Sequence, residues 1–344
     1  MSRFGFLSWR TTRMRVLSVA AGALASLAAP SYAGIVNFGS GANQFGMEFV
    51  TIGNLGNAAD TTGVPNSVGA VGYTYDIGKF EVSRAMVTAY NANPGVVEIT
   101  LDPMTGVTGG TGVNKPATGI TWNEAARFVN WLNIQKGFAP AYRYTSNTIT
   151  DNLTPWAPTD LLDYDASNPY RSKRANFFLP SFNEFYEAAF YDPNKSGQGV
   201  GGYWNYATGS DSIPSQTTGG TGANTAVYGQ AYAQGPADVT NAGGSSKYGV
   251  MGLDGNVWDW EESSQDRTNS NGSSNRGLRG GNWRDLTNMG SSVRDIDQVN
   301  DGNEDNGFRV ASLNSDAVVP EPSMMVIGTL FGLGGLAAKR RRKK

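Results

Sequence analysis

The chain contains no cysteine and no histidine among its 344 residues. Without cysteine it can form no disulfide, and it has neither a thiolate nucleophile nor a thiolate ligand for zinc or copper. Without histidine it lacks the usual general base, the Ser-His-Asp triad and the imidazole ligands of zinc and iron sites. We therefore expect no copper, iron or zinc cofactor, whereas calcium, which prefers oxygen ligands, stays compatible with the composition.

Charge is also scarce, because only 16% of the residues are charged and the net charge is -2. Both ends of the chain are basic, so the region between them is more acidic than the total suggests. A nucleic-acid partner is not expected from this balance. The 45 glycines, 15 tyrosines and 8 tryptophans instead indicate a body rich in turns that are anchored by aromatic side chains.

The N-terminal segment has the features of a secretory signal peptide. Its first fifteen residues carry four arginines and no acid, and the run 16–29 is apolar and uncharged. Small residues follow at Ser31 and Ala33, so we predict cleavage by signal peptidase after Ala33 and assign residues 1–33 to the leader. An amphipathic surface helix is the alternative, but the apolar run has no charged residue to form a polar face.

The C-terminal segment, residues 319–344, combines three features in a fixed order. Pro320, Glu321 and Pro322 precede an apolar stretch over 323–338, and six basic residues end the chain. As a helix the stretch would rise about 24 Å, less than the roughly 30 Å of a hydrocarbon core. The segment resembles the PEP-CTERM sorting signal, which implies processing by an exosortase at the Pro-Glu-Pro site after transient membrane association. An ordinary tail anchor would not explain the triplet.

Residues 34–318 read as a single domain with few regular elements. Helices are predicted after Ser83, over the capping pair Thr121 and Glu124, and over the capping pair Ser181 and Glu184. Short strands are predicted at 73–77 and 177–179, and the stretch 217–244 reads as loop. The expected fold class is α+β, with short strands and long ordered loops.

Five short stretches in this domain follow one another in a recognisable order: GAVGYTYDIGKFEVS, LPSFNEFYEAAFYDP, GLDGNVWDWEES, RGLRGGNWRD and NEDNGFRVAS. Together they resemble the formylglycine-generating enzyme, or sulfatase-modifying factor, family. The resemblance extends over about 37–313, nearly the whole domain. It implies one domain with a C-type-lectin-like fold and little regular secondary structure.

The residue types in these motifs favour structural roles. Trp258 and Trp260 lie on one side of a strand, where each can bury roughly 200 Å². Paired glycines allow a positive φ or a close backbone approach, and arginines can pair with a buried carboxylate such as Asp259 or Glu261. The predicted structural residues are Trp258, Trp260, Arg279, Gly280, Gly281, Trp283 and Arg309.

The resemblance also implies where redox chemistry would lie. Catalytic members hold copper with two cysteines between the paired glycines and the Gly-Phe-Arg motif, at positions that correspond here to Asp285 and Gly290. Neither residue can act as a soft thiolate ligand. Formylglycine generation by copper is therefore excluded, as is the iron chemistry of related branches, which uses histidines.

Calcium is the remaining family cofactor that the resemblance implies. One site corresponds to backbone carbonyls of Gly255 and Val257 and the carboxylate of Asp259, but a further ligand position falls on Gly252, for which Asp254 is a possible substitute. A second site resembles Asn224 and Thr225 and has no identifiable later aspartate. Turns closed by Asx hydrogen bonds are the alternative interpretation of both stretches. The acidic stretch 295–305 reads as a solvated loop or as a ligand-contact region.

These observations predict an exported, non-catalytic binding or structural module of the bacterial cell envelope or extracellular matrix, with a glycan or protein ligand. Two alternatives stay open. One is an enzyme that relies on carboxylates, such as a glycan hydrolase, although no acid pair is singled out by the sequence. The other is a non-catalytic partner of a sulfatase-modifying enzyme. Fold alone does not decide among these functions.

Overall fold

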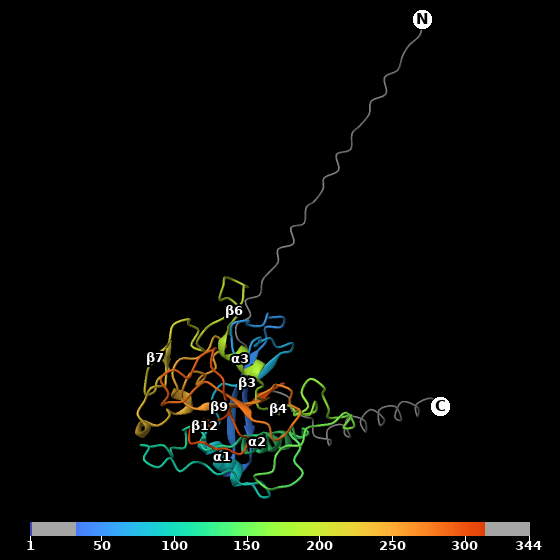
Figure 1. Ribbon diagram of the computed structural model, residues 1–344, viewed down its shortest axis with the longest axis vertical. Coiled ribbons are helices and arrows are strands. Elements are labelled where there is room, and N and C mark those ends of the chain that lie inside the picture. Colours follow the sequence, from blue (N-terminus) through green and yellow to red (C-terminus); the bar gives the residue numbers. More distant parts are fainter. Residues whose placement is uncertain (2–31, 314–344) are drawn as a thin grey trace, which may run out of the picture.

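The computed structural model describes residue 1 and residues 32–313. Its larger sheet is antiparallel, with the strand order β1-β2-β3-β13-β4. These strands are β1 (Tyr32–Phe38), β2 (Phe45–Ile52), β3 (Tyr75–Gly78), β4 (Phe177–Phe178) and β13 (Ala311–Ser312). The last strand of the domain therefore pairs with strands from its first and middle parts (Figure 1).

The second sheet carries most of the motif residues. Its order is β11-β10-β9-β12, with β12 parallel to β9 and the other pairs antiparallel. The strands are β9 (Trp258–Ser264), β10 (Arg276–Arg279), β11 (Asp295–Asp297) and β12 (Asn306–Gly307). Two small pairs complete the strands, β5 (Tyr191–Asp192) with β6 (Gly202–Tyr203) and β7 (Ser215–Gln216) with β8 (Thr225–Ala226).

The three α-helices of the described residues begin where the sequence predicts. They are α1 (Arg84–Asn91), α2 (Trp122–Gln135) and α3 (Phe182–Phe190), and short 3₁₀ turns lie at Gly41–Asn43, Tyr232–Gln234 and Val239–Asn241. Ser83 accepts a hydrogen bond from the backbone of α1, and α2 and α3 each begin with a reciprocal capping box. Local capping chemistry therefore fixes the helix starts.

The predicted α+β fold class is confirmed, with few helices, short strands and long ordered loops. Strand β3 starts two residues later than predicted, and the stretch 217–244 contains only β8 and two 3₁₀ turns.

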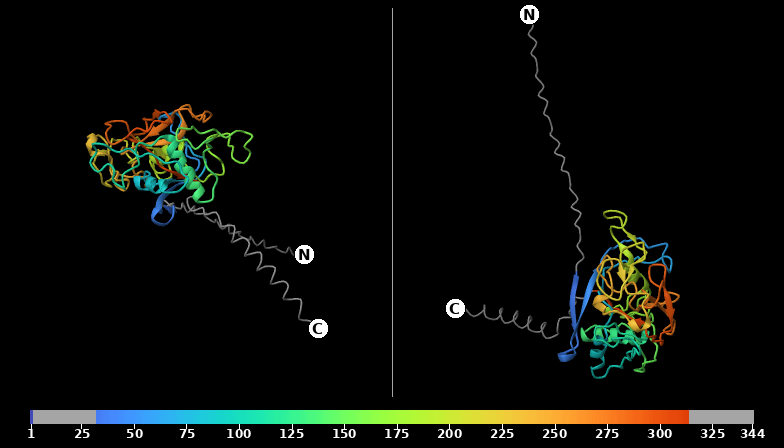
Figure 2. Two further views of the ribbon diagram at one scale, coloured as in Figure 1. Left: turned by 90° about the horizontal axis from the view of Figure 1, so that it is seen from below. Right: turned by 90° about the vertical axis from the view of Figure 1, so that its left-hand side faces the viewer.

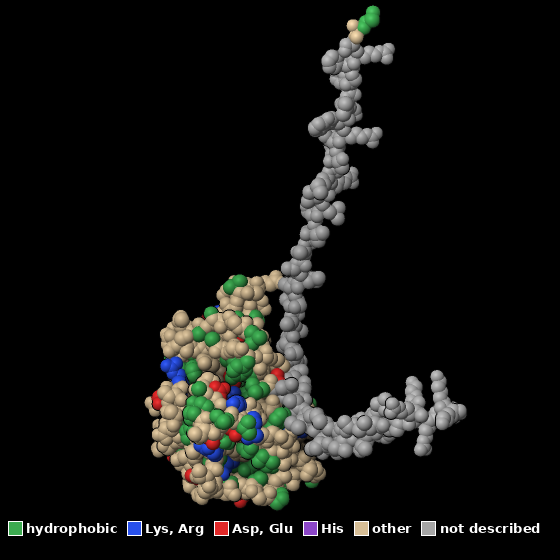
Figure 3. All heavy atoms as spheres, turned by 90° about the vertical axis from the view of Figure 1, so that its right-hand side faces the viewer, with side chains coloured by type: hydrophobic (Ala, Val, Ile, Leu, Met, Phe, Trp, Pro, Cys, Tyr) green, Lys and Arg blue, Asp and Glu red, His purple; other side chains and the backbone are tan. Residues whose placement is uncertain are grey.

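Charged side chains are sparse on the face shown in Figure 3, where they gather among hydrophobic side chains near its centre and lower half.

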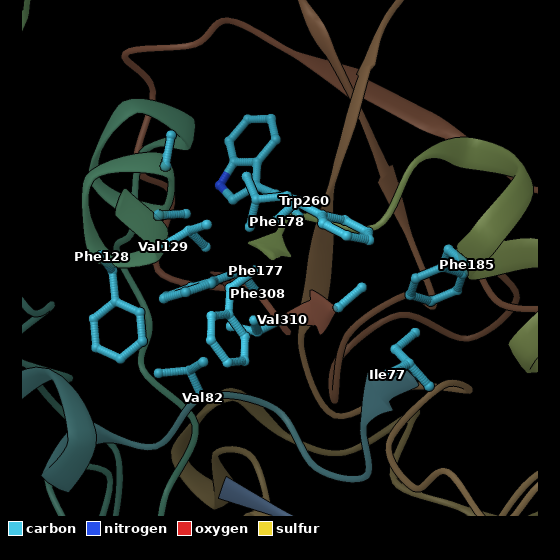
Figure 4. Packing of buried hydrophobic residues seen from close by; sticks show 14 of the residues in the cluster. Ile77, Val82, Phe128, Val129, Phe177, Phe178, Phe185, Trp260, Phe308 and Val310 are labelled. Atoms are coloured by element: carbon cyan, nitrogen blue, oxygen red, sulfur yellow. The ribbon is translucent and has the colours of Figure 1, made fainter. Parts of the chain in front are cut away.

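The main core lies between the sheets and helices α2 and α3 (Figure 4). Phe128 and Val129 of α2 project into it from one side, and Phe185 of α3 from the other. Phe308 and Trp260 pack in the middle, and both are fully buried. Burial of these large side chains supplies the main driving force that holds the loops on the scaffold.

Two terminal predictions fall at or beyond the edge of the domain. The expected cleavage after Ala33 falls within β1, which runs beside β2 as a long arm at one side of the molecule (Figure 2). Pro320, Glu321 and Pro322 lie outside the described residues, as does most of the leader. No helix among residues 32–313 is long and apolar enough to cross a membrane.

Candidate functional site

A buried ion pair joins the two sheets. The Arg309 Nε lies 2.7 Å from Oδ2 of Asp259, and neither side chain is exposed. The Arg309 Nη atoms donate to three backbone carbonyls, those of Gly78, Met251 and Gly252, each at 3.1 Å. A charge-assisted pair with this many hydrogen bonds fixes the relative positions of β9, β3 and the turn at 251–252.

A second buried carboxylate, Glu261, lies between two arginines. Arg279 Nε is 2.7 Å from its Oε1 and Arg294 Nε is 2.7 Å from its Oε2. Burial alone would raise the pKa of Glu261, but the two guanidinium groups hold it below its usual value. Both predicted arginines, Arg279 and Arg309, thus pair with one of the two acids named from the sequence.

The three motif tryptophans lie in the interior, not on a binding surface. Trp258, Trp260 and Trp283 are all buried, and the Trp260 indole donates to the carbonyl of Ile120 at 2.7 Å. Gly280 and Gly281 before Trp283 have φ values of +96° and +78°. A Cβ at the second glycine would lie 2.5 Å from the Asn288 carbonyl oxygen, so this turn requires glycine.

The residue that sequence reasoning missed is Glu81. Its carboxylate fills the space in front of Gly252, where a Cβ would lie 2.9 Å from Oε1. Oε2 accepts from the Asn256 amide at 2.7 Å, whereas Oε1 has no described hydrogen-bond partner. Asp259 likewise has one paired and one unpaired buried oxygen. Burial and the nearby Asp259 raise the pKa of Glu81.

Burial raises the pKa of both Glu81 and Asp259, and if both were ionised Arg309 would neutralise only one of the two negative charges, so a cation could balance the other. Unpaired buried carboxylate oxygens are costly unless a proton or a metal satisfies them. Their carboxylate oxygens are the donor type that calcium prefers, and Gly255 and Val257 lie just before Asp259 in the chain. No group of three or more Asp, Glu, His or Cys side chains within the described part of the chain could hold a metal.

The second expected calcium stretch has most of its donors engaged. The Asn224 Oδ1 accepts from the Thr208 hydroxyl at 2.9 Å, and the Thr225 carbonyl accepts from the Gly244 backbone at 2.8 Å. Asp254 also contacts this loop, since its Oδ2 accepts from the Thr208 backbone N–H at 3.2 Å. Burial raises the pKa of Asp254 to about 7. Asp254 thus lies toward the Asn224 loop, and Glu81 is the carboxylate beside Gly252.

The positions assigned to the family's cysteine pair differ in environment. Asp285 is half-buried, and its Oδ2 accepts from the amides of Asn282 at 3.0 Å and Asn288 at 3.2 Å. Gly290 is buried with φ +96°, and a Cβ there would lie 2.8 Å from the Asn205 carbonyl oxygen. The second position is therefore closed to any side chain, in addition to lacking a thiol.

Polar and apolar side chains share the surface around Asp285. Arg284 pairs with Glu304 at 2.9 Å and with Asp305 at 2.7 Å, and its guanidinium lies 5.5 Å from the Tyr232 ring. Leu286 beside them is 66% exposed. We call residues 282–288 with Tyr232, Glu304 and Asp305 the loop face. Ion pairs and aromatic packing hold it in an ordered conformation suited to recognition.

The acidic stretch between β11 and β12 borders the loop face through Glu304 and Asp305. Its Asp297 Oδ2 accepts from the amides of Asn303 at 2.7 Å and Asn306 at 3.3 Å. Gly302 packs closely on the Gly119 carbonyl. This stretch is therefore an ordered loop, which is closed by hydrogen bonds from its own side-chain amides.

The remaining buried acids are held in structural contacts. Arg171 Nη2 lies 2.9 Å from Glu184 and 2.6 Å from Glu262, and Tyr73 donates to Glu184 at 2.6 Å. Burial alone would raise the pKa of Glu184, but Arg171 lowers it below the usual value. Burial raises the pKa of Glu187 to about 8, yet this side chain is enclosed by the core. Glu184, Glu187 and Glu262 are all at most 1% exposed.

Comparison with known proteins identifies the scaffold. A model of the sulfatase-modifying factor enzyme 1-like domain family matches residues 31–313. The Treponema denticola variable protein 1 structure is similar at 19% identity and TM-score 0.52, covering 81% of this chain and 98% of that one. The structure of CarF matches at 18% identity and TM-score 0.51, covering 77% and 98%. At such identities the likeness shows the fold alone. A comparison with curated proteins gave no match.

The closed position at Gly290 gives a stability prediction with a matched control. Gly290 and Gly249 have similar φ values of +96° and +91°, but a Cβ at Gly249 would meet nothing within 4 Å. We expect Gly249→Ala to cost about 1 kcal/mol of unfolding free energy through backbone strain alone. Gly290→Ala should cost about 1–3 kcal/mol more, because its methyl group meets the Asn205 carbonyl. Urea denaturation measures both, and equal losses would contradict the closure.

Proposed function

The chain belongs to the sulfatase-modifying factor enzyme 1-like domain family, and on that premise we propose that it is a non-catalytic binding or structural module built on this scaffold. The observation that carries the proposal is the pair Asp285 and Gly290, one an amide-bound carboxylate and the other closed to a side chain. The motifs of the family scaffold are present around these two positions. The fold is therefore kept, whereas the cysteine ligands for redox chemistry are absent.

The loop face supplies the surface for a glycan, peptide or protein ligand. It presents an aromatic ring, a guanidinium, carboxylates and the exposed Leu286 within one ordered region. Such mixed surfaces support recognition without needing a nucleophile or a metal-bound oxidant. A carboxylate-based hydrolase is not favoured by the geometry, because Glu184 and Glu262 are paired with Arg171 and Glu187 is enclosed.

The binding test uses purified full-length protein on a glycan array and in pull-downs from envelope extracts. We expect at least one glycan or protein class to be retained. Leu286→Ser should weaken that binding, because Leu286 is an exposed apolar residue of the loop face. Leu161→Ser is the matched control, since Leu161 is 77% exposed and lies outside the loop face. No retained ligand, or equal effects of both substitutions, would argue against the proposal.

We further propose that the protein acts outside the cytoplasm, at the cell envelope, outer surface or extracellular matrix. The leader with its cleavage site after Ala33 and the Pro320-Glu321-Pro322 segment support this proposal. Signal peptidase and an exosortase-like enzyme are the processing partners that these segments require. Between cleavage steps the C-terminal segment would hold the protein transiently at the inner membrane.

Mass spectrometry of the protein recovered from its native host tests the processing. We expect an N-terminus at Gly34 and a C-terminus near Pro322, because the two signals direct cleavage at these points. Recovery of the intact basic end, KRRRKK, on all molecules would overturn the sorting proposal. Recovery with residues 1–33 still attached would overturn the export proposal.

Calcium is the cofactor that we propose for the buried site. Asp259 and Glu81 would bind through their carboxylates and Gly255 and Val257 through backbone carbonyls, as the family resemblance implies for all but Glu81. The bound ion would offset the excess negative charge and stabilise the turn that carries Trp258. Its contribution would be structural, because Glu81 and Asp259 are at most 1% exposed.

Thermal unfolding with and without calcium tests this assignment. At 100 times its dissociation constant, calcium should stabilise the protein by about 2.7 kcal/mol. Glu81→Gln should abolish most of that response, because it removes one of the two carboxylates. Glu187→Gln is the control, since Glu187 is also a buried carboxyl but lies outside this cluster. An unchanged calcium response in Glu81→Gln would refute the site.

A further inference from the structure

A pocket of about 650 Å³ lies beside α2. Its sides are formed by residues 93–97, by α2 with Arg127, Asn130, Trp131 and Ile134, and by Pro140, Tyr142, Arg143, Tyr144, Asn147 and Trp156. Its volume falls within the range of small-ligand sites. We call it the α2 pocket; it shares no residue with the loop face, so it is a separate feature of the molecule.

Aromatic side chains make up much of the pocket wall. Tyr90 and Trp131 are buried and meet edge to face, with ring centroids 5.6 Å apart. Tyr144 and Trp156 are half-buried and line the pocket nearer its opening. Flat rings that are partly open to solvent can pack against the apolar C–H face of a sugar ring.

The guanidinium of Arg127 is the polar feature that distinguishes the pocket. Its side chain is stacked 3.9 Å from the Tyr144 ring centroid, and only 7% of the residue is exposed. Nη2 donates to the Thr148 carbonyl at 2.7 Å. Among the described residues no acceptor bonds to Nε or Nη1, and no carboxylate forms an ion pair with this group. A buried cation with no carboxylate in direct contact favours an anionic ligand.

Arg143 contributes a second guanidinium, which is already neutralised. Its Nη1 lies 2.8 Å from Asp160, and its guanidinium carbon lies 5.0 Å from the Trp156 ring centroid. No aspartate or glutamate is among the residues that line the pocket. Arg127 therefore has no carboxylate in contact with it within the aromatic wall, and Asp151, which does not line the pocket, acts on it only at longer range.

We propose that the α2 pocket binds a sugar ring that bears a carboxylate, such as a uronic acid unit of an acidic polysaccharide. The carboxylate pairs with the Arg127 guanidinium, and the C–H face of the ring packs on Trp156, because the Tyr144 ring is already stacked on Arg127. A neutral sugar would leave the charge of Arg127 unpaired, and a small inorganic anion would leave the aromatic wall unused. This site goes beyond the proposed loop-face function and can fail without affecting it.

Calorimetric titration of the full-length protein tests the proposal with three trisaccharides. Trigalacturonate is the probe, galactotriose of the same linkage is the neutral control, and sulfated galactotriose tests whether any anion suffices. We expect trigalacturonate to bind at least about tenfold tighter than galactotriose, the effect of one charge-assisted hydrogen bond. Equal binding of the neutral sugar, tighter binding of the sulfated sugar, or no heat at millimolar trigalacturonate would overturn the proposal.

Variants assign the binding to the pocket. Arg127→Gln should weaken trigalacturonate binding at least about tenfold. Arg174→Gln is the control, because Arg174 lies outside the pocket and pairs with Asp163, and it should leave binding unchanged. Because Arg127 also holds the Thr148 loop, Trp156→Leu provides an independent test that spares this contact. Unchanged binding in a folded Arg127→Gln protein or in Trp156→Leu would overturn the site. Leu286→Ser should leave trigalacturonate binding intact, which separates this result from the loop-face test.

Discussion

The buried pair of Arg309 and Asp259 is the interaction on which the rest of the domain depends. It joins the segment between β12 and β13 to β9, to the carbonyl of Gly78 at the end of β3 and to the turn at 251–252. A fully buried guanidinium needs a nearby carboxylate to balance its charge and nearby acceptors for its N–H groups. The long loops stay ordered without regular secondary structure because two sets of buried ion pairs hold their ends in place. These are the Arg309–Asp259 pair and the pairing of Glu261 with Arg279 and Arg294.

Much of this architecture could be predicted from sequence because its signals are local or chemically specific. Capping pairs such as Thr121 with Glu124 lie three residues apart and fix a helix start without tertiary information. A buried arginine needs an acid, which limited the partners of Arg309 to Asp259 and Glu261. By contrast, strands of two residues such as β12 and β13 exist only because distant segments meet, so no periodicity predicts them.

Glu81 escaped prediction for a related reason. The family resemblance implies a further side-chain ligand for calcium at the position of Gly252, which has no side chain. The nearby Asp254 was therefore the predicted substitute. The structure supplies the carboxylate from the segment after β3, across the core. The α2 pocket was missed too, because Arg127, Tyr144 and Trp156 belong to a helix and a loop whose separate sequences carry no motif. Spatial convergence, and not residue type, defines both features.

The place of β13 in the larger sheet has a consequence for how the molecule matures. This strand lies between β3 and β4, so the sheet is interrupted until residues 311–312 arrive, although they are the last of the domain to be synthesised. Arg309, two residues earlier, arrives equally late. A nascent chain therefore lacks both the strand that joins β3 to β4 and the cation that pairs with Asp259 until synthesis of the domain is nearly complete. Such an order delays compaction of the partial chain until the whole domain is available.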